Sequence, residues 1–169
     1  MVAMRTGLFL APFLVAASFG AAQAVVIGGP LLRDGIEIVP SYLADVTLDR
    51  IPAAAGGIHL EADVHATKDE PHGFAPGAWI PYLTINYALT RDDVPTFKKS
   101  GLLYPMVSKT GPHYGANAEL SGPGTYRLTY IVSPPTSRGM LRHTDKASGV
   151  PDWWKPITAS WTFNYPSEK

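Results

Sequence analysis

The sequence contains no cysteine among its 169 residues. Without a thiol the chain cannot form a disulfide, a zinc finger, an iron–sulfur cluster, a thiolate nucleophile or a blue-copper centre. The fold must therefore be held by its hydrophobic core alone. A mature domain of about 145 residues can achieve this, because a domain of that size buries around two thirds of the surface of its unfolded chain.

The chain also lacks an excess of charge of either sign. It has 14 basic and 14 acidic residues and a formal net charge of zero. Nucleic acids and anionic membranes attract basic proteins, so the composition gives no reason to expect either of them as a partner. We therefore expect a small ligand or another protein, and no nucleic acid.

The apolar run near the N-terminus, residues 7–17, is short for a membrane span of ~20 residues. Arg5 precedes this run, and a small-x-small cleavage site that ends at Ala24 follows it. The pattern predicts a signal peptide, residues 1–24, that is cleaved and leaves no stable membrane anchor; a membrane anchor or a buried core helix is the alternative. The remainder, residues 25–169, has no repeat or break in composition and is predicted to form a single metal-binding domain.

Long helices have little room, because 16 Pro and 16 Gly are spread along the whole chain. Residues 157–165 instead alternate Ile, Ala, Trp, Phe and Tyr with Thr, Ser, Thr and Asn, which is typical of a half-buried strand. Further strands are predicted over residues 35–39, 43–48, 59–66, 80–90, 116–120 and 125–132. About seven short strands bounded by turn residues predict an all-β fold, an immunoglobulin-like antiparallel β-sandwich.

One of these strands carries a row of potential metal ligands. Alternate side chains of a strand point to opposite faces, so one face would carry His59, Glu61, Asp63 and His65, with Leu60, Ala62 and Val64 facing the core. An acidic residue at every second position is also what an ordinary solvated strand face looks like. Imidazole and carboxylate groups about 6 to 7 Å apart can nevertheless converge on an ion if loops close over the face.

Two connections rich in Pro, Gly or charged residues contain the other ligand types. The first, residues 104–115, carries Met106 and His113, and the second, residues 139–145, carries His143. A thioether favours copper, especially Cu(I), whereas Mg²⁺ and Ca²⁺ prefer oxygen ligands. Iron or manganese could be admitted through carboxylate oxygens. Taken singly, Met106 fits ordinary core filling and each histidine fits a surface or core position, so the metal hypothesis depends on the whole set.

The order and wording of six motifs give the chain a family resemblance over roughly residues 36–165. The motifs are His-Leu-Glu-Ala-Asp-Val-His-Ala from His59, Gly-Ala-Trp-Ile-Pro-Tyr-Leu-Thr from Gly77, Pro-Met-Val from Pro105, Gly-Pro-His-Tyr-Gly-Ala-Asn from Gly111, Arg-His-Thr-Asp from Arg142 and Trp-Trp-Lys-Pro from Trp153. This set resembles the periplasmic iron-transport accessory proteins, the copper- and iron-binding partners of bacterial high-affinity iron permeases.

The resemblance implies an immunoglobulin-like β-sandwich that forms a homodimer, with a copper site in each subunit near the dimer interface. Carried onto matching positions, the copper ligands are His59, Met106, His113 and His143, and Glu61 is the adjacent carboxylate tied to iron or to an alternative copper position. Iron or manganese would bind at the same or an adjacent site. Asp63 and His65 then become supporting or structural residues.

This chain departs from the resembled pattern in two places. Thr110 stands where family members often have an acidic residue three positions before the loop histidine, and residues 46–50 lack a Met-Glu pair. Both changes affect groups that would support the site rather than the His/Met set itself, which is retained. They put a second metal position in doubt.

The sequence thus predicts a periplasmic copper- and iron-binding protein that assists iron uptake by an inner-membrane permease and is not itself an enzyme. Two alternatives stay open at this point. One is a copper-dependent redox enzyme that acts on iron, and the other is a structural or protein-binding β-sandwich whose polar strand face is solvated.

Overall fold

The computed structural model describes residues 23–166. The predicted signal peptide therefore lies outside the described residues, except for its last two. Within the described part, no helix is both long enough and apolar enough to cross a membrane.

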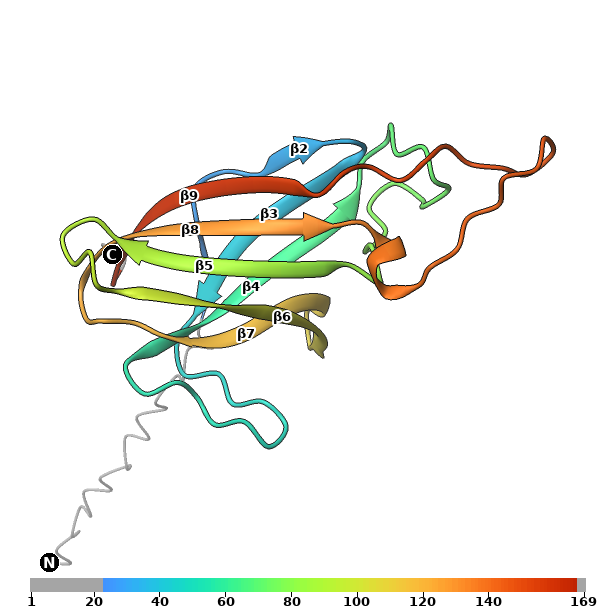
Figure 1. The fold of residues 1–169 in the computed structure, drawn as a ribbon. Helices are drawn as coiled ribbons and strands as arrows, with labels where there is room; N and C mark the ends of the chain where they lie inside the picture. Colours follow the sequence, from blue (N-terminus) through green and yellow to red (C-terminus); the bar gives the residue numbers. More distant parts are fainter. Residues whose placement is uncertain (1–22, 167–169) are drawn as a thin grey trace, which may run out of the picture.

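The described chain forms antiparallel strands and one short 3₁₀ turn, η1 (Pro135–Arg138) (Figure 1). The strands are β1 (Val25–Val26), β2 (Leu31–Arg33), β3 (Ile36–Leu43), β4 (Gly57–Ala66), β5 (Thr84–Arg91), β6 (Lys98–Ser108), β7 (Gly111–Glu119), β8 (Gly124–Ser133) and β9 (Ile157–Tyr165). Their hydrogen-bonded order is β1-β3-β4-β7-β6-β5-β8-β9, with β2 beside β3. The predicted all-β fold is confirmed.

Strand β6 joins the two sheets of the sandwich. Its first part, residues 98–103, pairs with β5, and its second part, residues 104–108, pairs with β7. One sheet therefore contains β1 to β4 and β7, the other contains β5, β8 and β9, and β6 belongs to both. Figure 1 shows β5 and β8 crossing in front of β3 and β4, which places the two sheets face to face.

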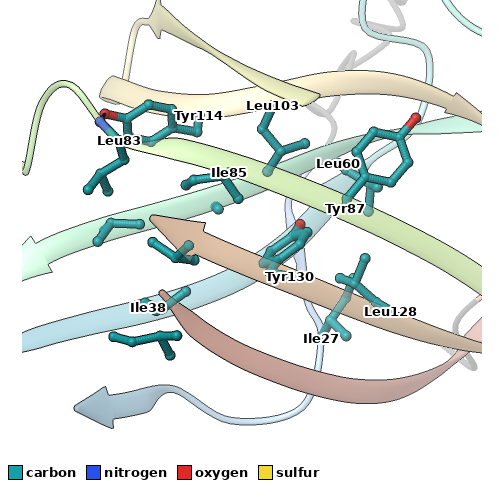
Figure 2. Packing of buried hydrophobic residues seen from close by; sticks show 14 of the residues in the cluster. Ile27, Ile38, Leu60, Leu83, Ile85, Tyr87, Leu103, Tyr114, Leu128 and Tyr130 are labelled. Carbon is teal, nitrogen blue, oxygen red and sulfur yellow. Dashed lines mark hydrogen bonds between the residues drawn. The ribbon is translucent and has the colours of Figure 1, made fainter. Parts of the chain in front are cut away.

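The core lies between these sheets. Figure 2 shows side chains from both of them, including Leu60, Ile85 and Leu128, meeting in this space, and all three are fully buried. Tyr130 is also fully buried, and its hydroxyl donates a hydrogen bond of 3.0 Å to the backbone carbonyl of Glu61. This bond fixes β4 to the opposite sheet at Glu61, one of the residues whose side chains lie on the metal-ligand face.

Strand β4 has the two faces that its alternation predicts. The side chains of Leu60, Ala62 and Val64 are fully buried in the core, so His59 and Glu61 lie on the opposite face. The strand predicted over residues 157–165 coincides with β9. Where one face of a strand is packed into a core, the hydrophobic pattern thus specifies which face carries the ligands.

Two predictions of local structure are wrong. Residues 44–47 form no strand, because the chain turns away after Leu43 with Asp45 at a φ of 56°, a left-handed conformation that a strand cannot contain. Residues 104–115 are not a loop but the two arms of the β6–β7 hairpin. Pro105 is tolerated there because β6 has no second partner beyond residue 103, so its missing N–H breaks no ladder.

Candidate metal centre

Three neighbouring strands bring four of the five predicted ligands together. His59 and Glu61 come from β4, His113 from β7 and Met106 from β6. Met106 is the direct cross-strand partner of His113, and β7 lies between β4 and β6 in the sheet. The pairing of the strands, rather than loops closing from above, therefore assembles most of the site.

The ligand atoms of His59, Glu61 and His113 all lie within 4.8 Å of one another. Glu61 Oε1 is 3.3 Å from His113 Nε2 and 3.7 Å from His59 Nε2. The two imidazole rings are nearly perpendicular, with centroids 6.1 Å apart and an interplanar angle of 86°. Two nitrogens and one oxygen thus converge on a single point, as a metal ion requires.

A hydrogen bond to Asn117 fixes the tautomer of His59. The side-chain amide of Asn117 donates to the backbone carbonyls of Val46 at 3.1 Å and Pro52 at 2.8 Å, so its oxygen must face His59. That oxygen accepts the Nδ1–H of His59 at 2.8 Å. The lone pair of His59 is therefore on Nε2, the nitrogen that faces Glu61 and the centre.

The other two ligands are oriented in the same way. His113 Nδ1 donates to the backbone carbonyl of Gly111 at 3.3 Å, which leaves the lone pair on Nε2. Glu61 Oε2 accepts a hydrogen bond of 3.2 Å from the buried hydroxyl of Ser41, so Oε1 is directed to the imidazoles. Such bonds to the outer atoms of metal ligands hold the rings in place and set which nitrogen can bind.

Gly115 provides the space that the His59 ring occupies. A Cβ at this position would lie 2.7 Å from His59 Nε2, 2.9 Å from His59 Cε1 and 3.0 Å from the carbonyl oxygen of Leu60. Any side chain at residue 115 would therefore displace the nitrogen that faces the centre. In the sequence, His113, Gly115 and Asn117 occupy every second position, which places them on one face of β7. This spacing could have indicated that they share the site, but neither Gly115 nor Asn117 was predicted to have a role.

The centre is buried although it opens into a cavity. His59 is 2% exposed and His113 5% exposed. Burial lowers the pKa of His59 below its ordinary value of 6.5, while its hydrogen bond to Asn117 and the charge of Glu61 act in the opposite direction. The neutral form of the imidazole, which is the form that binds metals, is therefore favoured at His59.

The cavity above the centre has a volume of about 520 Å³ and is lined by all four of these side chains, Met106 included. Val46 and Thr110, in the two segments that depart from the resembled family pattern, lie at its wall. The hydroxyl of Thr110 is 2.7 Å from that of Ser108. A neutral hydroxyl thus stands where an acidic side chain would bring an additional oxygen ligand to the cavity.

His143 does not lie with the other predicted ligands of its own chain. It belongs to an arm, residues 139–152, that leaves η1 and reaches away from the sandwich before the chain returns to β9 (Figure 1). Its side chain is 75% exposed and its Nδ1 is 2.7 Å from the hydroxyl of Ser148. The geometry of one chain therefore supports His59, Glu61, Met106 and His113 as one centre, and the role of His143 stays a prediction.

Comparison with known proteins supplies the family. The model of the family described as Fe2+ transport protein matches residues 21–167 of this chain. The chain belongs to this family. A UPF0423 protein of Brucella abortus is 42% identical in an alignment that covers 95% of this chain and 92% of that protein. The family resemblance read from the motifs is confirmed.

Solved structures of relatives have the same fold. FetP of uropathogenic Escherichia coli is 40% identical, with a TM-score of 0.79 over 85% of this chain and 96% of that chain. The copper-reconstituted P19 protein from Campylobacter jejuni is 39% identical, with a TM-score of 0.80 over 87% of this chain and 99% of that chain. The likeness extends over nearly the whole described sandwich and supports the predicted fold class.

The close approach at Gly115 yields a testable prediction. The change Gly115→Ala is expected to weaken binding of a Cu(II) probe by about 10- to 100-fold, the usual loss when the support of a metal ligand is disturbed. The measurement is isothermal titration of the metal-free protein. Gly29→Ala is the matched control, because a Cβ at Gly29 meets nothing within 4 Å. Equal affinity of the Gly115 variant and the control would contradict the role of this gap.

Proposed function

We propose that this protein is a periplasmic copper-binding protein that assists iron uptake by an inner-membrane permease. The observation that carries the proposal is the convergence of His59 Nε2, His113 Nε2 and Glu61 Oε1 within 4.8 Å, in a cavity that Met106 also lines. Membership of the Fe2+ transport protein family supports the link to iron. The copper-bound structures of the relatives FetP and P19 support the choice of metal.

The donor set itself favours copper. Two neutral imidazoles and a thioether suit both oxidation states of copper, with the soft sulfur of Met106 favouring Cu(I). Copper held there would supply a one-electron redox couple. Glu61 Oε1 adds a hard oxygen donor between the imidazoles, which is the group through which iron or manganese would be admitted at the same or an adjacent site.

We further propose that His143 completes the centre of a second copy of the chain in a homodimer. The hydroxyl of Ser148 donates to Asp145 Oδ2 at 2.8 Å. The hydrogen bonds that Asp145 accepts lower the pKa of its carboxyl group and keep it ionised. Ser148 must then accept the Nδ1–H of His143, which leaves the lone pair on an exposed Nε2. His143 is thus prepared in the same tautomer as His59 and His113, and among the described residues its Nε2 has no hydrogen-bond partner.

The cellular setting follows from the same proposal. Residues 1–24 act as the cleaved signal peptide, and residues 25–169 form the single mature domain in the periplasm. The structure of FetP was determined on protein expressed in the periplasm, which supports this location. The inner-membrane iron permease is the expected partner. The balanced charge of the chain gives no reason to expect that it binds nucleic acid.

Removing one imidazole tests the copper site. Isothermal titration with copper should give one strong site per wild-type chain and none in His113→Ala, because the remaining donors cannot enclose the ion. Lowering the pH should weaken copper binding to the wild type, since protons compete for the imidazoles. Because burial lowers the pKa of His59 below its ordinary value of 6.5, this competition begins at a lower pH for His59 than for a free histidine. Unchanged affinity in His113→Ala would contradict the assignment of this ligand, whereas a wild-type chain that binds no copper, iron or manganese would favour a structural sandwich with a solvated polar face.

An iron-oxidation assay separates a carrier from a redox enzyme. Copper-loaded protein is expected to oxidise Fe(II) at most once per bound copper, because a carrier does not turn over. The assay follows Fe(III) formation under air, with His113→Ala as the control for unbound copper. Many oxidations per bound copper would contradict the carrier and support an enzyme.

Mixed dimers test whether His143 acts across the interface. His113→Ala and His143→Ala each remove one ligand, so neither variant alone has a complete centre. If His143 acts in the second copy, a mixed dimer of the two variants contains one complete centre, and about half of wild-type copper binding returns when differently tagged chains are co-expressed and purified together. No recovery in the mixed dimer would contradict the exchange of His143 between subunits.

A further inference from the structure

A second histidine–carboxylate pair, His72 and Glu70, lies outside the metal centre and is almost completely buried. Their side chains are 4% and 1% exposed, and His72 Nδ1 is 2.7 Å from Glu70 Oε1. The Glu70 carboxylate also accepts the backbone N–H of His72 at 2.8 and 2.9 Å and that of Phe74 at 3.0 Å. A buried carboxylate with this many donors is held rigidly in the loop that follows β4.

Both ring nitrogens of His72 face acceptors. Nδ1 meets the Glu70 carboxylate, and Nε2 is 3.1 Å from the backbone carbonyl of Asp152. Both contacts have the length of hydrogen bonds, so the ring is held at both of its nitrogens. Both nitrogens of His72 are thus engaged within the chain, whereas the Nε2 atoms of His59 and His113 face the metal centre.

The His72 ring holds the end of the arm that bears His143. It stacks on Trp153, with ring centroids 4.5 Å apart and an interplanar angle of 15°, and it meets the edge of Trp154 at 5.5 Å. Trp154 is itself buried in the core. A buried ring that stacks on Trp153, meets the edge of Trp154 and is hydrogen-bonded to Asp152 fixes three successive residues where the arm returns to the sandwich.

From Asp152 the contact continues to His143. The Asp152 carboxylate forms an ion pair with Arg142, whose guanidinium also donates to the carbonyl of Val150 at 3.1 Å. The N–H of Val150 in turn donates to the carbonyl of His143 at 3.1 Å. These bonds join the two segments of the arm, residues 142–143 and residues 150–152. Through its bond to Asp152, His72 fixes both segments to the β-sandwich.

We propose that His72 and Glu70 are positioning residues for the metal centre: they anchor the arm at Asp152 to Trp154 and so set where His143 is presented to a second copy of the chain. This inference rests on the proposed function of His143 as a ligand across the interface. The buried His72–Glu70 pair would then have a role beyond the stability of its own chain, because it decides whether the third imidazole reaches the copper.

The test is a double-mutant cycle in the full mature chain with copper as the probe. His72→Phe keeps a ring against Trp153 but removes both hydrogen bonds, and His72→Gln is the milder variant if the first folds poorly. Each is expected to weaken copper binding by about tenfold or more and to give the Cu(II) EPR spectrum of His143→Ala. In the His143→Ala background, the same change at His72 should cause no further loss.

The outcomes separate the anchor from its alternatives. Tyr126→Phe is the control, since it removes a buried hydroxyl bonded to Gly122, Ser121 and Arg91 rather than to the arm, and it should lower Tm without altering the EPR spectrum. The proposed anchor would be contradicted if the losses of copper affinity multiply in the double variant, or if both His72 variants give the wild-type EPR spectrum. An unchanged spectrum in His143→Ala alone would contradict the proposed role of His143 itself.

Discussion

The hydrogen bond between Asn117 and His59 is the interaction on which the metal centre depends. The Asn117 amide nitrogen donates to two carbonyls of the 44–56 loop, and its oxygen accepts the Nδ1–H of His59. One side chain therefore closes the loop over His59 and selects the nitrogen that faces the cavity. Without this bond, the His59 ring could flip or change tautomer, and the convergence with Glu61 and His113 would be lost.

This bond acts on a frame that the core makes rigid. The inner face of β4 is packed between the sheets, and the Tyr130 hydroxyl ties the Glu61 carbonyl to the opposite sheet. The positions of the ligands are thus set by strand register, with Gly115 leaving room for the ring. A site built on packed strands can hold its geometry before any ion arrives, so less ordering is needed on binding.

Strand alternation alone was sufficient to predict the two faces of β4, because a period of two is decisive where one face is fully buried. Residues 44–47, predicted as part of a strand, and residues 104–115, predicted as a connection because of their Pro and Gly, were both assigned wrongly. Asp45 takes a left-handed conformation that no periodicity reveals, and Pro105 looks like a loop residue until it is known to lie on an edge strand. The roles of Asn117 and Gly115 depend on contacts between β4 and β7, which a single sequence does not display. His143 was named through family resemblance, and its exposed position on the arm explains why no pattern within one chain could link it to the centre.

In the proposed centre, copper binds between the Nε2 atoms of His59 and His113, beside the sulfur of Met106, and His143 of a second copy completes the site. A crystal structure of the copper-loaded protein, with anomalous scattering recorded at the copper edge, tests this arrangement. We expect one anomalous peak per chain, within bonding distance of both Nε2 atoms and the thioether, with the arm of a second copy at the mouth of the cavity. A peak at another place, ligation through Nδ1, or a loaded centre with no second copy beside it would contradict this arrangement.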